Sequence, residues 1–508
     1  MNAKATKTAI TPTRAENYNE WYQKIVRASD FAELSGVRGC QILKAWGYGV
    51  WEQMQHDLDR RFKETGHENY YFPVYIPLSY FQKEADHVEG FAKEMAVVTH
   101  HRLTKNAEGK LVPDGELEEP LIIRPTSETI IGESMSKWIQ SYRDLPLLLN
   151  QWANVSRWEM RPRILLRTAE FLWQEGHTAH ETFDDAMHET KQMLDVYADF
   201  CEQVMAIPVI KGEKIAAERF PGAVNTLCIE AMMQDGRALQ AGTSHYLGHS
   251  FAKACNIQYQ SREGNLEYVH TTSWGMSTRM LGALVMTHGD DNGMKTPPRV
   301  APWQIVIVPI LREDSPKDEI LEYCEQLKAD LLCETLEGQS LRVKLDTRDI
   351  ASSDKRWEWI KKGAPLILEI GVKDIAGNKV CVTRRDKLED GKSFENRSTF
   401  TGKAGAILAD IQKSMFETAL AFRNSRLVTD IKDWAAFEAY FSKDADSSFT
   451  GGQGFVRAKW CGDEASLAKL DPLGVTVRCI PFDQDGSEGT CVLTGKPATQ
   501  EVIFARAY

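Results

Sequence analysis

The segment between residues 157 and 171 constrains the fold of this 508-residue chain more than any other. It consists of Arg157-x-Glu159, seven further residues, and then Arg167-x-x-x-Phe171. Alternate residues of a β-strand share a face, so Arg157 and Glu159 would point the same way, as would Arg167 and Phe171. We therefore expect a hairpin of two strands and a seven-residue loop, presenting two guanidinium groups, a carboxylate and an aromatic ring.

This set of side chains suits a bent nucleoside triphosphate. Arginine binds phosphate through two N–H donors and glutamate accepts from an exocyclic amine, while an aromatic ring and a guanidinium can sandwich a purine. Arg-x-Glu alone is more often part of an ordinary charged hairpin. The combination becomes specific with a distant segment of small residues ending in arginine, residues 272–279 (TSWGMSTR).

The two segments resemble motifs 2 and 3 of the class II aminoacyl-tRNA synthetases. Residues 124–128 (RPTSE) and 170–177 (EFLWQEGH) resemble the prolyl-tRNA synthetases of the archaeal/eukaryotic-like type. The resemblance extends from about residue 18 to residue 508. It implies ATP-dependent ligation of L-proline to tRNA(Pro) through a prolyl-adenylate, carried out by a homodimer.

Two alternatives stay open. Another class IIa synthetase, such as the threonyl enzyme, would need a zinc-binding cysteine and two histidines in place of Thr126-Ser127-Glu128. A non-catalytic synthetase paralogue that binds tRNA would usually lose the ATP-binding arginines, and here they are present. A proline-dependent ATP–pyrophosphate exchange assay separates the three possibilities.

Aminoacyl-tRNA synthesis needs no protein nucleophile, because it depends on positioning and on stabilising charge at phosphorus. By resemblance, Arg157 and Arg279 are the catalytic residues: Arg157 holds the α-phosphate and the proline carboxylate, and Arg279 holds the γ-phosphate. Motif 3 departs from its usual glycines at Ser273 and Ser277, which are still small. The residues assigned to ATP, which is expected to bind with Mg²⁺, are Arg157, Glu159, Arg167, Phe171, Gln240, Thr243 and Arg279.

Proline recognition has a simple requirement. The secondary ammonium of proline has two N–H donors, so its site needs two acceptors close together, and Thr126 and Glu128 would supply a hydroxyl and a carboxylate. The same pattern also occurs at capped helix starts, and His245 could equally be a packed histidine. The residues assigned to proline by resemblance are Thr126, Glu128, Arg157, Trp173, Glu175, His177, His245, Ser273 and Gly275.

The fold implied by the resemblance has three domains. Residues 1–17 are expected to be a flexible polar arm. Residues 18–298 would form an α+β catalytic domain, with an antiparallel sheet flanked by helices. Within it, apolar residues repeat at the helical period over 41–62 and precede an extended segment, 71–77. This unit resembles motif 1, the dimer element, although a plain helix–strand unit would show the same pattern.

A different pattern starts at the apolar run 305–308. It predicts a strand, a helix (315–333), a strand (341–345), a helix (351–362) and a strand (365–371). This βαβαβ alternation indicates an α/β domain, which the resemblance identifies as the anticodon-binding domain, over 299–410. The residues assigned to the anticodon of tRNA are Glu358, Lys373, Arg384 and Arg385. A solvated charged face would have a similar composition.

Residues 411–508 are expected to form a small α/β C-terminal domain. Related enzymes bind structural zinc there through four cysteines. This chain has Cys461 and Cys491, but Thr494 and Ser466 stand near where other thiolates would be. Two thiolates do not complete a tetrahedral site, so we predict a zinc-site remnant and no metal.

Further expectations concern the chain end, the compartment and editing. The C-terminal Tyr508 matches a family feature and is expected to be a tether that reaches the catalytic domain.

Ten cysteines without a Cys-x-x-Cys pair indicate reduced thiols and a cytoplasmic protein. No apolar run approaches the ~18 residues of a membrane span. The net charge of −11 argues weakly against nucleic acid, but residues 157–167 include four arginines.

The chain between Phe171 and Thr272 is about a hundred residues long. This is too short for the editing insertion of many bacterial-type prolyl enzymes, so hydrolytic editing is not expected. An apolar pocket rejects smaller analogues only weakly, because each missing methylene is worth about 1–3 kcal/mol. Mischarging with alanine and cysteine is therefore expected.

Overall fold

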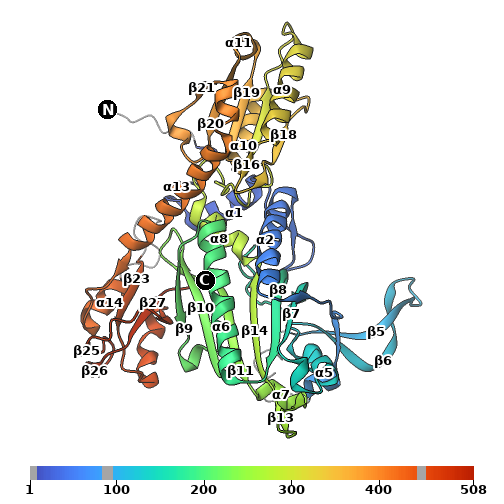
Figure 1. Cartoon of the computed structure of the whole chain (residues 1–508), viewed down its shortest axis with the longest axis vertical. Helices are drawn as coiled ribbons and strands as arrows, with labels where there is room; N and C mark the ends of the chain where they lie inside the picture. Colours follow the sequence, from blue (N-terminus) through green and yellow to red (C-terminus); the bar gives the residue numbers. More distant parts are fainter. Residues whose placement is uncertain (1–7, 83–94, 443–452) are drawn as a thin grey trace.

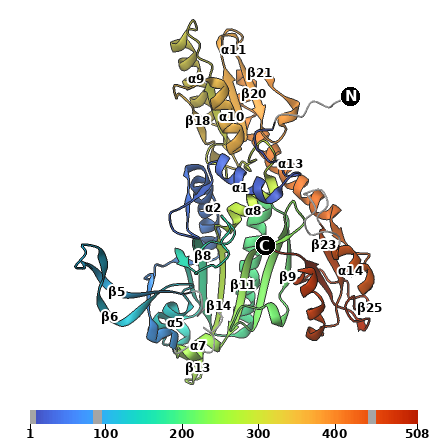
Figure 2. The same ribbon diagram turned by 180° about the vertical axis from the view of Figure 1, so that it is seen from behind.

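The computed structural model describes residues 8–82, 95–442 and 453–508. The chain forms a central body, an upper domain from its middle-to-late residues and a smaller domain from later residues, and the C-terminus lies against the central body (Figure 1). Seen from behind, helix α13 (Ala404–Ser425) connects the upper domain with the smaller one (Figure 2). The expected boundary at residue 410 therefore falls inside a helix, because α13 is one continuous connector.

An antiparallel sheet forms the centre of the body. Its strands, in spatial order, are β9 (Val209–Glu213), β10 (Asn225–Met232), β11 (Ala238–Gly248), β14 (His270–Ser277), β8 (Glu170–His180), β7 (Leu147–Ser156) and β3 (Glu68–Asn69). Only the β3–β7 pair among these is parallel. This is the α+β catalytic core that the resemblance implied.

Helix α6 (Phe183–Asp199) covers one face of this sheet (Figure 1). The helix starts at Thr182, whose side chain accepts a hydrogen bond from the N–H of Asp185, and its Tyr197 donates to Gln174 of β8. Because side chains alternate along a strand, the residues next to Gln174 point to the opposite face. That face carries the cavity described below.

The N-terminal elements are helix α1 (Tyr18–Ala28), strands β1 (Ala32–Leu34) and β2 (Gln41–Leu43), and helix α2 (Ala45–Glu64). The helix predicted from residue 41 therefore starts later, because residues 41–43 pair with β1 instead. The extended segment after α2 includes β4 (Tyr75–Pro77), which leads into the short α3 (Leu78–Gln82).

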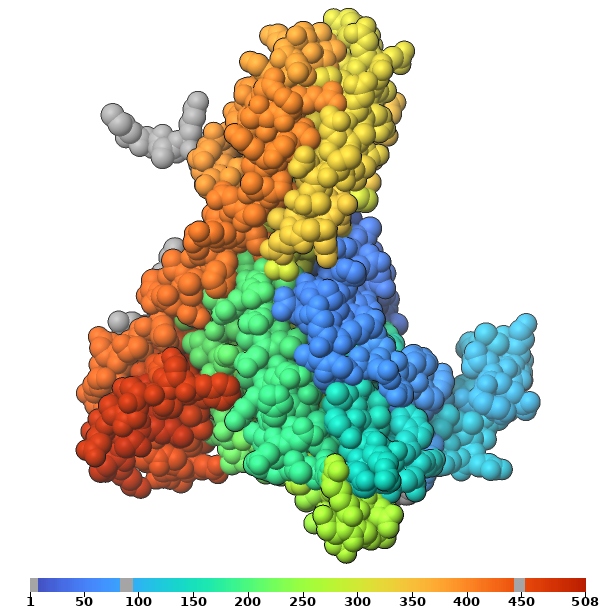
Figure 3. All heavy atoms as spheres, in the orientation of Figure 1, coloured from blue at the N-terminus to red at the C-terminus, as the bar shows by residue number. Residues whose placement is uncertain are grey.

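A long hairpin extends away from the body (Figure 3). It consists of β5 (Ala96–Lys105) and β6 (Leu111–Ile123), and β4 adds to it beside β6. Helix α5 (Glu128–Trp138) follows at the RPTSE segment. The short elements between β11 and β14 are α7 (Ser250–Ala254), β12 (Gln258–Gln260) and β13 (Leu266–Tyr268), and helix α8 (Arg279–His288) follows β14.

The upper domain confirms the predicted α/β alternation. Its sheet has the order β18 (Val343–Leu345), β15 (Ile305–Pro309), β19 (Leu366–Ile370), β20 (Lys379–Arg384), β21 (Ser393–Asn396). The first three strands are parallel, and β20 and β21 add antiparallel strands. The helices are α9 (Lys317–Leu332), α10 (Ser352–Lys362), α11 (Val372–Ala376) and α12 (Arg397–Thr401).

The smaller domain continues the central sheet. Beyond α13 its elements are β22 (Leu427–Val428), α14 (Trp434–Ser442), β23 (Phe455–Lys459), β24 (Thr476–Pro481), β25 (Gly489–Thr490), β26 (Pro497–Ala498) and β27 (Glu501–Ala505). Strand β24 pairs with β9, so one sheet of eleven strands runs through both domains. No helix in the described ranges has both the length and the apolar character to cross a bilayer.

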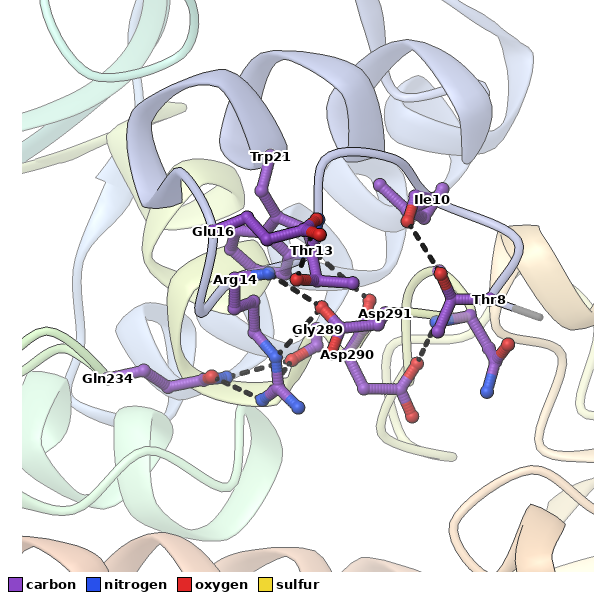
Figure 4. A network of polar contacts seen from close by, with 12 residues as sticks. Thr8, Ile10, Thr13, Arg14, Glu16, Trp21, Gln234, Gly289, Asp290 and Asp291 are labelled. Carbon is purple, nitrogen blue, oxygen red and sulfur yellow. Dashed lines mark hydrogen bonds and ion pairs between the residues drawn. The ribbon is translucent and has the colours of Figure 1, made fainter. Parts of the chain in front are cut away.

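The expected flexible arm is wrong for residues 8–17. Ile10 is 2% exposed in the core, and its N–H donates to Asp291 O at 2.9 Å. The Arg14 side chain donates to Asp291 and Gln234 (Figure 4). Composition alone suggested fraying, whereas these long-range partners fix the segment. Residues 1–7 lie outside the described residues.

Candidate active site

A cavity of about 330 Å³ lies on the face of the central sheet opposite α6. Its lining combines residues of motifs 2 and 3, the RPTSE segment and strand β11. The predicted site residues in this lining are Thr126, Glu128, Arg157, Phe171, Trp173, Glu175, His177, Gln240, Thr243, His245, Ser273, Gly275 and Arg279.

Strand register explains why residues so far apart in sequence meet here. Opposed residues of antiparallel strands point to the same face. Two rows cross β8, β14 and β11 in this way: Glu175–Gly275–Thr243 and His177–Ser273–His245. Because the middle residue of each row is small, room remains above the sheet for a ligand.

The start of α5 and the residues just before it place a hydroxyl and a carboxylate in the cavity lining. Thr126 Oγ1 donates to Glu128 Oε2, and both residues are less than 10% exposed. Ser127 lies at the N-cap position of α5 but makes no side-chain capping bond. The geometry therefore favours the substrate role of this segment over an ordinary capped helix start.

Glu175 is buried and held by several donors. Its carboxylate accepts from Ser127 Oγ (2.5 Å), Ser127 N (3.2 Å), Gln151 Nε2 (2.8 Å) and His177 Nε2 (3.0 Å). Burial alone would raise the pKa of Glu175, but the hydrogen bonds and charge of His177 and the other donors lower it. Burial would lower the pKa of His177, and the bond to Glu175 with the charges of Glu128 and Glu175 raises it instead. The pair is thus poised to be ionised, with His177 fixed at the wall of the cavity.

Arg157 lies at the centre of the cavity wall. Its guanidinium is 5.7 Å from the ring centroid of Phe171 and 5.4 Å from that of Trp173, and its Nε donates to Pro125 O at 2.9 Å. The guanidinium is therefore held in the cavity wall by two aromatic rings and one backbone carbonyl.

Arg279 approaches the same cavity from the first turn of α8. Its Nε donates to Leu166 O at 3.1 Å. Burial and the positive charges of Arg167 and Arg157 lower the pKa of Arg279 to about 10, so it stays protonated at neutral pH. Arg157 and Arg279 thus place two guanidinium groups in the cavity lining, and a polyanion such as a triphosphate would relieve the repulsion between them.

The predicted hairpin geometry is wrong in one respect. Strand β7 ends at Ser156 and β8 begins at Glu170, so Arg157, Glu159 and Arg167 lie in the connection and not in strands. Pro162 cannot donate to a ladder, and Leu165 has a φ of +64°, so extended pairing cannot continue. Glu159 Oε2 lies 3.8 Å from Arg167 Nε, and the structure places both outside the cavity lining.

Strand β11 contributes Gln240, Thr243 and His245 to the lining. The Nδ1 of His245 is 3.0 Å from Thr226 Oγ1, and its ring lies 4.8 Å from the ring of Phe220. Burial, with the nearby His177, lowers the pKa of His245 to about 3. His245 is therefore a neutral wall residue with one fixed ring nitrogen.

The cavity lining also contains nine residues that were not assigned to the site: Glu218, Arg219, Phe220, Thr226, Ala241, Gly242, Trp274, Met276 and Ser277. The first three come at the end of a short 3₁₀ turn, Ala216–Glu218, and directly after it, and Arg219 donates to Val224 O (2.7 Å) and Glu213 (3.0 Å). The available signal was a charged and aromatic loop that ends at a Pro-Gly pair. Such a loop carries no periodicity that would point to a site.

The predicted anticodon residues differ in their exposure to solvent and in their ion-pair partners. Lys373 is exposed on α11, and Glu358 pairs with Arg348 at 2.7 Å on the surface. Arg384 pairs with Asp386 and Asp410, both at 2.8 Å. Arg385 is 1% exposed, so a contact between its side chain and tRNA is excluded in this conformation. The pattern Arg-Arg could not reveal that Arg385 is buried between domains.

Cys461 and Cys491 are the two cysteines of the expected zinc-site remnant in the C-terminal domain. Cys461 Sγ is 3.4 Å from Thr494 Oγ1, and Cys491 is buried. Within residues 8–82, 95–442 and 453–508 no cluster of three or more His, Cys, Asp or Glu side chains could hold a metal ion. The absence of zinc stays a prediction.

Tyr508 contacts the catalytic domain. Its hydroxyl donates to Asp235 Oδ2 at 2.5 Å and its N–H to Ala238 O at 3.1 Å. The guanidinium of Arg163, from the connection between β7 and β8, lies 4.7 Å from its ring centroid. The chain end therefore touches the segment that also carries Arg157.

An antiparallel sheet that holds a motif 2 arginine, a motif 3 arginine and a nucleotide-sized cavity on one face defines a class II aminoacyl-tRNA synthetase. The family model "tRNA synthetase class II core domain (G, H, P, S and T)" matches residues 111–288, "Anticodon binding domain" matches 304–396, and "Prolyl-tRNA synthetase, C-terminal" matches 444–508. With the full-length relatives described next, these matches show that the chain belongs to the prolyl-tRNA synthetase family.

The relatives cover the whole chain. The proline–tRNA ligase of Paramagnetospirillum magneticum is 59% identical over 506 residues, and that of Protochlamydia amoebophila is 54% identical over 508, with 100% of each chain covered. Among solved structures, prolyl-tRNA synthetase from Cryptosporidium parvum, complexed with halofuginone and AMPPNP, has a TM-score of 0.88 at 34% identity and covers 98% of this chain and 97% of that one. The chain is thus an enzyme that ligates proline to tRNA, with ATP as the energy source.

Proposed function

We propose that the cavity holds proline at its Thr126–Glu128 end and ATP between Arg157 and Arg279. The single observation that carries this proposal is that one cavity is lined by both arginines and by Thr126 and Glu128, whose hydroxyl lies beside the carboxylate. The two N–H donors of the prolyl ammonium match these two acceptors. Trp173 and His177 then wall the ring, and Glu175 holds His177 in place.

The residue roles follow from charge. In the first step a proline carboxylate oxygen attacks the α-phosphorus and pyrophosphate leaves; Arg157 neutralises charge on both reacting groups, and Arg279 holds the leaving γ-phosphate. In the second step a terminal ribose hydroxyl of tRNA(Pro) attacks the prolyl carbonyl and AMP leaves. Phe171 stacks on adenine, with Gln240 and Thr243 beside it. Glu159 and Arg167 join when the 157–169 connection folds over the nucleotide.

Magnesium enters with the nucleotide. The described residues offer no metal cage of their own, and Mg²⁺ commonly binds through substrate phosphates with few protein carboxylates. The residues present fit an ion that is carried by ATP. Of the three carboxylates in the lining, Glu128 is assigned to proline and Glu175 to His177, so Glu218 would be the one that contacts the ion. The Cryptosporidium structure, which is a complex with halofuginone and AMPPNP, supports a nucleotide in this cavity.

Proline-dependent ATP–pyrophosphate exchange tests the proposal. We expect exchange with proline, none with threonine, and a loss of at least about 100-fold in Arg279→Ala, because a charged contact to a leaving phosphate is removed. Arg161→Ala is the matched control: Arg161 is exposed in the connection that carries Arg157 and does not line the cavity. Exchange that is equal in the two variants would contradict the assignment.

We propose further that the enzyme is of the archaeal/eukaryotic-like type without an editing domain. The elements from β8 to β14 account for the chain between Phe171 and Thr272, and the similarity to the eukaryotic Cryptosporidium chain is consistent with the type. Alanyl-tRNA made by the enzyme should then persist in a purified assay. Rapid deacylation by the isolated protein would contradict this.

The remaining assignments are also proposals. We infer a cytoplasmic homodimer that uses α2 and the following extended segment as its dimer element, with units 18–298 and 299–410 joined by α13 to a zinc-free C-terminal unit. Analytical ultracentrifugation tests the dimer, and metal analysis of the purified protein tests the zinc. In the second domain, the residues proposed to face the anticodon are Glu358, Lys373 and Arg384. Tyr508 is proposed to be a tether to the catalytic domain.

A further inference from the structure

The segment after α8 is held against the anticodon-binding domain by its backbone. The N–H of Met294 donates to Lys361 O at 2.9 Å, and the N–H of Thr296 donates to Gly363 O at 3.1 Å. Gly293 has a φ of +124°, and a Cβ there would come within 2.5 Å of Lys361 Cα. This segment therefore cannot shift without moving the end of α10.

A buried ion pair completes the junction. Arg385 Nη1 and Nη2 donate to the two carboxylate oxygens of Asp290 at 2.9 and 2.6 Å, and Nη2 also donates to Gly293 O at 3.0 Å. Its Nε donates to Ile360 O at 2.9 Å. Burial would raise the pKa of Asp290, but the charge and hydrogen bonds of Arg385 lower it to about 2. Both groups stay charged, and the forked geometry fixes their orientation.

The same junction is tied to the catalytic machinery by one helix. Helix α8 begins with Arg279 and ends at His288, two residues before Asp290. Its residues 280–286 are all fully buried, and ten residues of helix span about 15 Å. A movement of Asp290 along this axis is therefore transmitted to the residue that faces the nucleotide cavity.

The N-terminal segment braces this end of the helix (Figure 4). Gln234 Nε2 donates to Thr287 O and Gly289 O, both at 2.9 Å, and Gln234 Oε1 accepts from Arg14 Nη1 at 2.7 Å. The N–H of Arg14 donates to Asp291 Oδ1 at 2.8 Å. The last carbonyls of α8 are thus satisfied by side chains, which fixes the helix end from both sides.

We propose that the Asp290–Arg385 pair couples the anticodon-binding domain to the active site: the position that this domain adopts on tRNA sets the position of α8, and with it Arg279. The inference rests on the proposed roles of Arg279 and of the second domain. Asp290 and Arg385 are positioning residues, since neither lines the cavity. The Arg385 side chain is 1% exposed, and a buried charge left without its partner is costly, whereas Asp290 is 18% exposed and also lies 3.4 Å from Lys295 Nζ. The pair therefore ties the second domain to the end of α8.

Two variants and a matched control test the coupling. Arg385→Lys keeps the charge but loses the fork, and Asp290→Asn keeps one acceptor but loses the charge. Arg397→Ala is the control: this arginine pairs with Asp330 at 2.6 Å within the second domain. Each protein is assayed with full-length tRNA(Pro), with an acceptor-stem minihelix that lacks the anticodon, and by proline-dependent exchange without tRNA.

We expect kcat for full-length tRNA to fall about tenfold in both junction variants, a typical coupling magnitude, with KM for tRNA within about twofold. Minihelix charging and exchange should be unchanged, and the control should match the wild type throughout. The proposal is overturned if kcat with full-length tRNA is unchanged, if only KM for tRNA rises, or if all three activities fall together with thermal stability.

Other outcomes are distinguishable. If the wild-type enzyme showed no exchange with proline, the proposed function would fail and not the coupling. If Asp290→Asn does not fold, Arg385→Lys and Arg14→Ala test the coupling. The partly exposed side chain of Arg14 braces the same end of α8, so Arg14→Ala should lower kcat for full-length tRNA in part. An Arg14→Ala enzyme identical to the wild type, beside an unchanged Arg385→Lys enzyme, overturns the proposal.

Discussion

Replacing Glu175 by glutamine removes one charge from the wall of the proposed proline site and keeps the shape of the side chain. In the structure this carboxylate accepts four hydrogen bonds, from Ser127 N, Ser127 Oγ, Gln151 Nε2 and His177 Nε2, at 2.5 to 3.2 Å. A glutamine has one carbonyl oxygen with two acceptor sites and an NH₂ group that only donates. The Ser127 hydroxyl can turn and accept from that NH₂, but three N–H donors then compete for two sites.

The expected cost follows from this count. One buried donor left unsatisfied costs about 1–3 kcal/mol, and replacing the charge-assisted bond of His177 by a neutral one costs about 1 kcal/mol more. The sum is about 2–4 kcal/mol. At about 2–4 °C per kcal/mol for a domain of 150–250 residues, Tm should fall by about 4–16 °C. With His177 no longer fixed, KM for proline should rise about tenfold, equivalent to about 1.4 kcal/mol.

Differential scanning fluorimetry and exchange kinetics measure the two effects. The matched control is Glu64→Gln on α2: this side chain is 60% exposed and pairs with Arg60, and exposed helix pairs of this kind contribute about 0.3–0.5 kcal/mol. The reasoning is refuted if Glu175→Gln melts within 2 °C of this control (about half of the smallest shift expected) and binds proline as the wild type does.

Three other predictions follow from single contacts. Deleting Tyr508 removes its bond to Asp235 and should slow prolyl-adenylate formation with the circular dichroism spectrum unchanged; an unaltered exchange rate would argue against the tether. The pKa of His177 is raised from 6.5, so its protonated form stabilises the fold below that pH and this contribution is lost as pH rises through the folded pKa. The Tm difference between the wild type and His177→Asn should therefore shrink from about pH 6 upward, and a difference that grows would contradict the pair. Lys373→Ala should raise KM for tRNA at least about fivefold and leave exchange without tRNA unchanged, whereas an equal loss in both assays would exclude an anticodon role.

The second domain shows what local patterns can predict. The predicted strand at 305–308 and helix at 351–362 agree to within one or two residues with β15 (Ile305–Pro309) and α10 (Ser352–Lys362). Both predictions succeed because a buried strand and a helix that ends at a glycine are determined by residues close together in the sequence. The chemistry of the proline site was also accessible, since Thr126 and Glu128 are close in sequence and meet in space.

The errors share a different cause. Arg385 was assigned to the anticodon of tRNA, yet its partner Asp290 lies 95 positions away, and no local pattern records such a pairing. Residues 8–17 looked like a frayed arm for the same reason. The loop that contributes Phe220 to the cavity joins the site through tertiary packing against His245, which periodicity does not encode.

The joint between β24 and β9 gives the smaller domain a role that does not depend on metal. Ile480 and Pro481 pair with Glu213 and Gly212, and a Cβ on Gly212 would come within 2.5 Å of Ile480 O. A chain truncated after α13 would leave Gly212 and Glu213 of β9 without their β24 partners, and an unpaired strand border is a template for self-association. The C-terminal unit thus shields the catalytic sheet from its own copies.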